Sequence, residues 1–168
     1  IQSLAFSHDS SMVACTTANR EVIIYGSETG DVLRSISLPL SAIGNTVFSA
    51  DDTTVALWQG RKTIASFNLK NGKQVQEIYV PNNSRGDPAN GGVISLDGKL
   101  AAANTGSQIR IYNVVKGITL HLLNEVDEQV GWSGVSADGS SISVVDGSTV
   151  KTWDLKTADV LHERPIPA

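Results

Sequence analysis

A short pattern of residues recurs four times along the chain, and it constrains the fold more than any other feature. Each copy contains Ser, any residue and Asp, then an apolar run, then an aromatic residue seventeen or eighteen positions after the Ser. The Ser residues are 42, 46 and 41 positions apart. The sequence therefore predicts four similar structural units in a row. The copies are Ser7/Asp9 with Tyr25, Ser49/Asp51 with Phe67, Ser95/Asp97 with Tyr112, and Ser136/Asp138 with Trp153.

Each unit divides into four short strands, because apolar and polar residues alternate between clusters of turn residues. Four strands in about 40 to 45 residues is the period of a propeller blade. We predict an all-β fold, a β-propeller segment of four four-stranded antiparallel blades that belongs to a larger propeller, with approximate blades at 1–40, 41–87, 88–127 and 128–168. The expected strands are 3–7, 12–16, 21–25 and 31–36; 45–49, 54–58, 63–67 and 74–80; 92–95, 100–104, 108–112 and 119–123; and 132–136, 141–145, 149–153 and 159–163.

The turn residues repeat as well. The Asp of each copy follows a first strand, where its carboxylate can accept a backbone N–H two residues on, with Gly98 and Gly139 relieving a positive φ in two of these turns. After the third strand, Gly residues share one position in three copies, and Ala158 takes that position in the fourth. We expect either a strain of about 1 kcal/mol at Ala158 or a different last turn.

Composition and charge narrow the classes of protein. The chain has 168 residues, and its net charge of -4 is spread without a basic stripe, which disfavours nucleic-acid binding. No run approaches the roughly 18 apolar residues of a membrane span. Cys15, the only cysteine, lies in an apolar run and is expected to be a buried, inert thiol. This fits an intracellular protein, cytoplasmic or nuclear. Because the chain opens at Ile1 without a start Met or a signal peptide, we expect a fragment.

The end of the third strand also points to a family. Asp or Asn follows the aromatic residue in three copies, and Trp153-Asp154-Leu155-Lys156-Thr157 is similar to the end of a WD repeat. The whole chain resembles the degenerate WD-repeat β-propellers, although the Gly-His pair that opens a repeat in that family is absent from all four copies. The family's hydrogen-bonded tetrad is therefore not carried over. The resemblance implies that partners dock on one rim, formed by the connections between second and third strands and between successive blades.

That rim supplies the candidate partner-binding residues. Trp58 and Trp132 are possible hot spots, although core packing is the interpretation we favour for both. The longest connection, 81–91, contains an Asn-x-Ser motif and an Arg-Gly-Asp motif, which we interpret as parts of an irregular surface loop. Insertions of this kind in repeat proteins often mark a binding face. Glu125, Asp127 and Glu128 form an acidic cluster on the same rim. The candidates are Asn19, Arg20, Trp58, Gln59, Arg61, Arg85, Asp87, Ser107, Glu128, Trp132 and Asp146.

The sequence gives little indication of a catalytic, metal-binding or phosphate-binding site. His8, His121 and His162 fall in different repeats without partners at metal-ligand spacing, and we expect surface or edge positions for them. The Asp51-Asp52 pair is interpreted as a turn with one solvated member. No motif for a nucleophile or a phosphate site occurs. We predict no catalytic residue, no cofactor and no metal.

The leading hypothesis is a non-enzymatic protein-interaction scaffold within a larger protein or complex. Its partners are expected to be other protein chains or further blades, without direct nucleic-acid or membrane binding. One alternative is part of a propeller enzyme, a hydrolase or quinoprotein-type dehydrogenase, with catalytic groups outside this segment. Another is a structural half-propeller that oligomerises. We also expect the blade with Val13, Ile23 and Leu33 and the blade with Val144, Val150 and Leu161 to pack on material outside these residues.

Overall fold

The computed structural model describes residues 1–40, 42–60, 62–82, 92–105, 108–124 and 130–167. Every regular element in these ranges is a strand, and the strands form four antiparallel sheets of four strands each. The predicted all-β fold with four-stranded blades is confirmed. Within each sheet, hydrogen-bonded neighbours are also neighbours along the chain.

The strand bounds lie within a few residues of those expected from the alternating pattern. The first sheet contains β1 (Ser3–Phe6), β2 (Met12–Thr17), β3 (Glu21–Gly26) and β4 (Val32–Ser37). The second contains β5 (Ala42–Phe48), β6 (Thr54–Gln59), β7 (Thr63–Asn68) and β8 (Gln74–Tyr79). The third contains β9 (Gly92–Ile94), β10 (Leu100–Asn104), β11 (Ile109–Asn113) and β12 (Ile118–Leu123). The fourth contains β13 (Val130–Val135), β14 (Ser141–Asp146), β15 (Thr149–Asp154) and β16 (Val160–Pro165).

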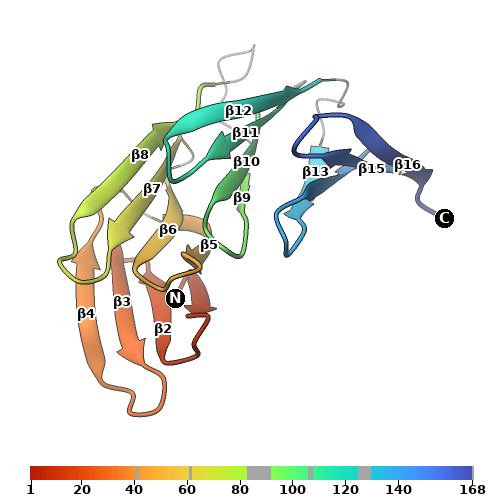
Figure 1. Cartoon of the computed structure of the whole chain (residues 1–168). Helices are drawn as coiled ribbons and strands as arrows, with labels where there is room; N and C mark the ends of the chain where they lie inside the picture. Colours follow the sequence, from red (N-terminus) through yellow and green to blue (C-terminus); the bar gives the residue numbers. More distant parts are fainter. Residues whose placement is uncertain (41, 61, 83–91, 106–107, 125–129, 168) are drawn as a thin grey trace.

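The four sheets follow one another around an arc (Figure 1). Their first strands are in contact in sequence, β1 with β5, β5 with β9 and β9 with β13. The first sheet, in red and orange, and the fourth sheet, in blue, stand at opposite ends of the arc (Figure 1). The described part of the chain is therefore an open series of blades in which each sheet packs on its neighbours in sequence.

The two sides of each sheet pack against different neighbours. We call the side that faces the previous sheet the preceding side, and the opposite one the following side. Ala14, Val22 and Ile24 lie on the following side of the first sheet and pack on Val55 and Phe67, which lie on the preceding side of the second. Similar apolar clusters join the second sheet to the third and the third to the fourth. Because strand side chains alternate, a single period-2 sequence pattern supplies both surfaces.

The repeated aromatic residue belongs to the preceding side. Phe67, Tyr112 and Trp153 are buried in the clusters that join their sheets to the previous ones. In each sheet, the pairing of the third and fourth strands has a β-bulge between the aromatic residue and the residue before it. Tyr25 has the same place in the first sheet and is half-buried. The expectation that these residues are mainly buried is confirmed for three of the four, and Tyr25 differs because no described sheet precedes it.

The expectation for the outer blades needs one correction. Val13 and Ile23 are only partly buried, and Leu33 is exposed, as expected for an uncovered sheet. Val144, in contrast, is buried against the third sheet. Val144 lies on the preceding side of its sheet and not on the following side, so it does not belong to the outer face of that blade.

The Ser-x-Asp motif builds the same turn in all four sheets. Each Ser Oγ donates to the Asp Oδ1 at 2.6 to 2.7 Å. Each Asp Oδ1 also accepts the N–H two residues further on, as predicted. The residue after the Asp has a positive φ in every copy, and it is Gly98 and Gly139 in two of them. The motif is therefore a repeated structural cap of the first hairpin.

The last hairpin keeps the backbone of the other three. Gly30, Gly72 and Gly117 have φ values of 73°, 70° and 70°, and Ala158 has 65°. The N–H at this position donates to the carbonyl four residues earlier in all four sheets. Ala158 thus adopts a left-handed conformation that an L-residue resists. Of the two expected outcomes, the strained one is confirmed.

We predict that Ala158→Gly raises the free energy of unfolding by about 0.5 to 1 kcal/mol, because relief of the left-handed strain exceeds the added chain entropy of Gly. The matched control is Gly30→Ala, since a Cβ there would meet nothing within 4 Å and only the φ of +73° opposes it. Urea unfolding of both variants measures the effect. A loss of stability in Ala158→Gly would contradict the strain.

Candidate binding groove

The predicted rim is only partly described. Asn19 and Arg20 lie exposed in the turn between β2 and β3. Trp58 and Gln59 end β6 and are buried, with Trp58 only 2 % exposed. Trp132 lies in β13 and Asp146 in β14, but their side chains are outside the described part of the structure. Five of the candidates lie outside the described residues altogether: Arg61, Arg85, Asp87, Ser107 and Glu128. The Arg-Gly-Asp motif and the acidic cluster lie outside them as well.

Trp58 is a packing residue. Its ring joins the apolar cluster between the second and third sheets, and a Cβ added at Gly92, the first residue of β9, would overlap it. The core interpretation of Trp58 is therefore confirmed. Replacement of Trp58 is expected to harm the fold, because the side chain is buried between two sheets.

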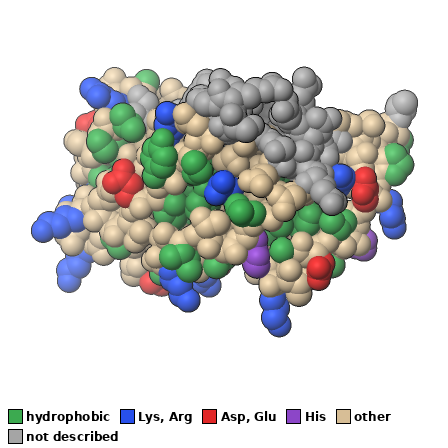
Figure 2. Space-filling view, turned by 90° about the horizontal axis from the view of Figure 1, so that it is seen from above, with side chains coloured by type: hydrophobic (Ala, Val, Ile, Leu, Met, Phe, Trp, Pro, Cys, Tyr) green, Lys and Arg blue, Asp and Glu red, His purple; other side chains and the backbone are tan. Residues whose placement is uncertain are grey.

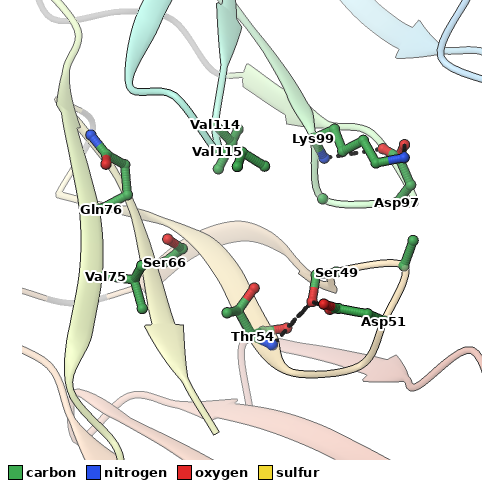
Figure 3. Close-up of a pocket in the computed structure, with 12 residues that line it drawn as sticks. Ser49, Asp51, Thr54, Ser66, Val75, Gln76, Asp97, Lys99, Val114 and Val115 are labelled. Carbon is green, nitrogen blue, oxygen red and sulfur yellow. Dashed lines mark hydrogen bonds and ion pairs between the residues drawn. The ribbon is translucent and has the colours of Figure 1, made fainter.

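A groove lies between the second and third sheets, near the Ser-x-Asp turns (Figure 3). Its volume is about 260 Å³. Val75 and Gln76 come from β8, and Val114 and Val115 from the turn between β11 and β12, so the side chains of two sheets face one another across it (Figure 3). Val75 is 57 % exposed and Val115 69 % exposed, so two aliphatic side chains on the walls of the hollow are open to solvent.

Tight backbone contacts between the sheets shape this groove. The N–H of Ala50 donates to the carbonyl of Asp97 at 3.1 Å, which joins the first turns of the two sheets. A Cβ at Gly98 would lie 3.1 Å from the Phe48 carbonyl oxygen, and the φ of this glycine is +69°. Gly98 therefore serves both the conformation of its turn and the close approach of the neighbouring sheet.

The charged groups of the groove are fixed by the same turns. Asp51 is bound to Ser49 and Thr53, while Lys99 Nζ lies 3.3 Å from Asp97 Oδ2 (Figure 3). The hydrogen bonds from Ser49 and Thr53 lower the pKa of Asp51 to about 2. Burial would raise the pKa of Asp97, but bonds from Ser95 and Lys99 lower it overall. Two carboxylates and one ammonium give the groove a slightly negative character, and Asp51 is a poor proton donor at neutral pH.

The same pKa shifts predict acid sensitivity. Hydrogen bonds from Ser136 and Ser140 lower the pKa of Asp138 to about 2, from an ordinary value of 3.8. The folded state thus binds fewer protons than the unfolded state between about pH 4 and pH 2, and stability falls as pH falls through this window. Urea midpoints measured from pH 5 to pH 2 should show this decline. The decline should be shallower in Asp51→Asn/Asp138→Asn; an equal slope would contradict the role of these turns.

Asp52 makes a contact between two sheets that the sequence did not predict. Its carboxylate accepts the N–H of His8 at 2.8 Å and that of Asp9 at 3.0 Å, and it lies 3.0 Å from His8 Nδ1. Asp51 is the exposed member of this pair, and Asp52 links the second sheet to the first turn of the first. Burial opposes ionisation of Asp52, but these hydrogen bonds lower its pKa overall. His8 is exposed, as expected, and serves this link.

Other kinds of site find little support in the described residues. They contain no group of three or more His, Cys, Asp or Glu side chains placed to hold a metal ion. Among them, no helix has the length and apolar character needed to cross a membrane. Lys and Arg side chains are scattered over the face shown in Figure 2. Cys15 is a buried free thiol, as expected.

Sequence reasoning missed Val75 and Val115 as surface candidates. Val75 lies at the bulge of its fourth strand, where Leu33, Leu120 and Leu161 are also exposed. An aliphatic residue repeated at that place in four strands was the available signal. Whether such a residue borders a groove depends on the neighbouring sheet, which the repeat alone does not specify.

No family model matches the sequence. The structure is similar to a solved structure of Kuenenia stuttgartiensis hydrazine synthase, with a TM-score of 0.75 and 18 % sequence identity. The similarity covers 98 % of this chain and 48 % of that one, so this chain spans about half the length of the protein it matches. At this identity the likeness concerns the fold, and together with the four successive sheets it shows that the chain has an all-β, propeller-type fold.

Proposed function

We propose that this chain is a non-enzymatic scaffold that binds a segment of a partner protein in the groove between its second and third sheets. The groove carries the proposal because Val75 and Val115 are exposed at a hollow whose walls are held by hydrogen-bonded turns. Preformed hollows with apolar surfaces and a few fixed polar groups are typical binding sites. The likeness to hydrazine synthase concerns the fold and brings no activity to this chain.

The chemistry of the groove favours an extended segment with one aliphatic side chain. That side chain would cover Val75 and Val115, while the amide of Gln76 and the hydroxyl of Thr54 offer partners to a peptide backbone. Since Asp51 and Asp97 outnumber Lys99, a basic residue beside the aliphatic one is favoured. The turn residues Asn19 and Arg20 are exposed on a second surface, the predicted rim.

A peptide selection tests the proposal. Displayed random peptides are selected on the whole chain, and the affinity of the best binder is measured by calorimetry. We expect Val75→Asp and Val115→Asp each to weaken binding at least tenfold, because they place a charge on the apolar surface. The matched control is Val160→Asp, an exposed aliphatic residue on β16, which should change affinity less than twofold.

Two results would count against the proposal. A selection that yields no binder would oppose a scaffold function for this chain. A binder that is insensitive to both groove substitutions but is lost with Arg20→Ala would place the site on the rim, on the other connections of the blades.

A further inference from the structure

One polar residue lies at the inner end of the groove between the second and third sheets. Ser66 on β7 lines the groove and belongs to the following side of its sheet, which faces the third. Figure 3 shows it beside Val75. Ser66 is only 7 % exposed, whereas Val75 and Val115 are mainly exposed. The groove therefore has an apolar mouth and a polar inner end.

The repeat shows which residue the other sheets have at this place. Ser66 directly precedes the repeated aromatic residue of its sheet, as Ile24 does in the first sheet and Ile111 in the third. Ile24 and Ile111 are each 1 % exposed and pack in the clusters that join their sheets to the next ones. A Ser side chain is smaller than an Ile side chain and cannot fill the same volume. Ser66 accordingly leaves room at the interface where the groove lies.

The neighbouring strand differs at the same level. Gln76 on β8 pairs with Ser66, and Arg34 on β4 has the equivalent place in the first sheet. Arg34 crosses to the second sheet, where its Nη2 donates to the carbonyl of Lys70 at 2.7 Å. The amide of Gln76 instead lies against the turn at Gly117, because a Cβ added there would overlap it. The hydrogen bond that spans the first and second sheets at this level thus has no counterpart between the second and third sheets in the described part of the chain.

The hydroxyl of Ser66 is available to a ligand. It has no hydrogen-bond partner among the described residues. A buried hydroxyl without a partner is costly, so a ligand that bonds to it is favoured over one that places only apolar atoms there. Asp51 and Asp97 disfavour a carboxylate in the groove, and an ammonium is better placed beside these two residues than at a buried hydroxyl. The inner end is therefore suited to an uncharged polar group.

We propose that Ser66 determines which partner segment the groove accepts. The accepted segment inserts an uncharged side chain that ends in a carboxamide or a hydroxyl, next to the aliphatic side chain that covers Val75 and Val115. This inference rests on the proposed binding of a partner segment in the groove. Ser66 supplies both the room and the hydrogen bond, and an Ile at its place would close the inner end.

Matched peptide pairs test this on the whole chain. The probes are capped peptides with Lys and Leu fixed at adjacent positions, and every other position is changed in turn from Met to Gln and from Val to Thr. The two members of each pair are similar in size and differ in hydrogen bonding. At one position we expect the polar member to bind about tenfold more tightly in calorimetry, because a site that bonds a polar group discriminates against the analogue that lacks it. This preference should disappear in Ser66→Ala.

A second variant tests the room that Ser66 leaves. Ser66→Ile should weaken binding of the preferred polar peptide at least tenfold, and urea unfolding checks that the variant is folded. The matched control is Thr152→Ile, which changes the same place in the fourth sheet, away from the groove, and should change affinity less than twofold. Ser66→Ala carries the test alone if Ser66→Ile does not fold.

Three results would overturn this inference and leave the scaffold function intact. The first is a set of peptides that lose affinity in Val75→Asp but show no preference for a polar side chain. The second is a polar preference that persists in Ser66→Ala, since another residue would then supply the hydrogen bond. The third is a folded Ser66→Ile that binds as tightly as the unaltered chain. If neither these probes nor the random peptides bind in the groove, both proposals are wrong.

Discussion

Trp58→Ala is expected to lower the free energy of unfolding by about 3 to 5 kcal/mol, the range for truncation of a large buried aromatic residue. The indole fills the space between the second and third sheets and is only 2 % exposed. Its Nε1–H has no hydrogen-bond partner among the described residues, so the loss comes from packing. Urea unfolding measures the effect, and a loss below about 1 kcal/mol would contradict the packing described.

A double-mutant cycle with Gly92 makes this test specific. A Cβ at Gly92 would overlap the Trp58 ring and approach the carbonyl of Ala102. Gly92→Ala is therefore expected to destabilise the chain, and part of that cost should disappear in the Trp58→Ala background, where the ring is absent. Coupling of contacting residues commonly reaches 0.5 to about 3 kcal/mol. Strict additivity of the two substitutions would show that they do not meet.

The second large effect is expected at Tyr112. Tyr112→Ala should cost about 3 to 5 kcal/mol, because the ring is buried against the second sheet. Tyr25 provides the matched control: it has the same residue type and the same place in its sheet, but it lacks a previous sheet, and Tyr25→Ala should cost about 1 kcal/mol or less.

Tyr112→Phe separates packing from hydrogen bonding. Burial raises the pKa of Tyr112, and its hydroxyl has no hydrogen-bond partner among the described residues. Removal of that hydroxyl should leave stability close to that of the unaltered chain. Equal losses in Tyr25→Ala and Tyr112→Ala would contradict the assignment of this position to the contact between sheets.

The repeat could be predicted from the sequence because the residues that specify it are close together in the chain. Alternation of side chains places the strands, and Ser-x-Asp caps each first hairpin through bonds that span a few residues. The position of Ala158 could be aligned with three glycines; this left strain or a different turn open, and the φ of 65° is the strained outcome. Such features depend on neighbours in the chain, so the pattern of residues specifies them.

Contacts between sheets were harder to predict. Asp52 was expected only to belong to a turn, yet it binds His8, which is 44 positions away. Val144 and Val150 belong to one sheet, but only Val144 is in a cluster with the third sheet. The groove at Val75 and Val115 depends on how far apart two sheets stand. Each of these depends on which side of a strand meets the next sheet, and the alternating pattern alone does not give that.

The order of strands within each sheet also has a consequence for how the chain becomes structured during synthesis. All hydrogen-bonded strand pairs join segments that are consecutive in sequence. Short loops close quickly and at low entropic cost, so each sheet can form as soon as its own residues have left the ribosome. The first sheet need not wait for the fourth. The order of appearance from the ribosome would then also be the order in which the contacts between sheets are made.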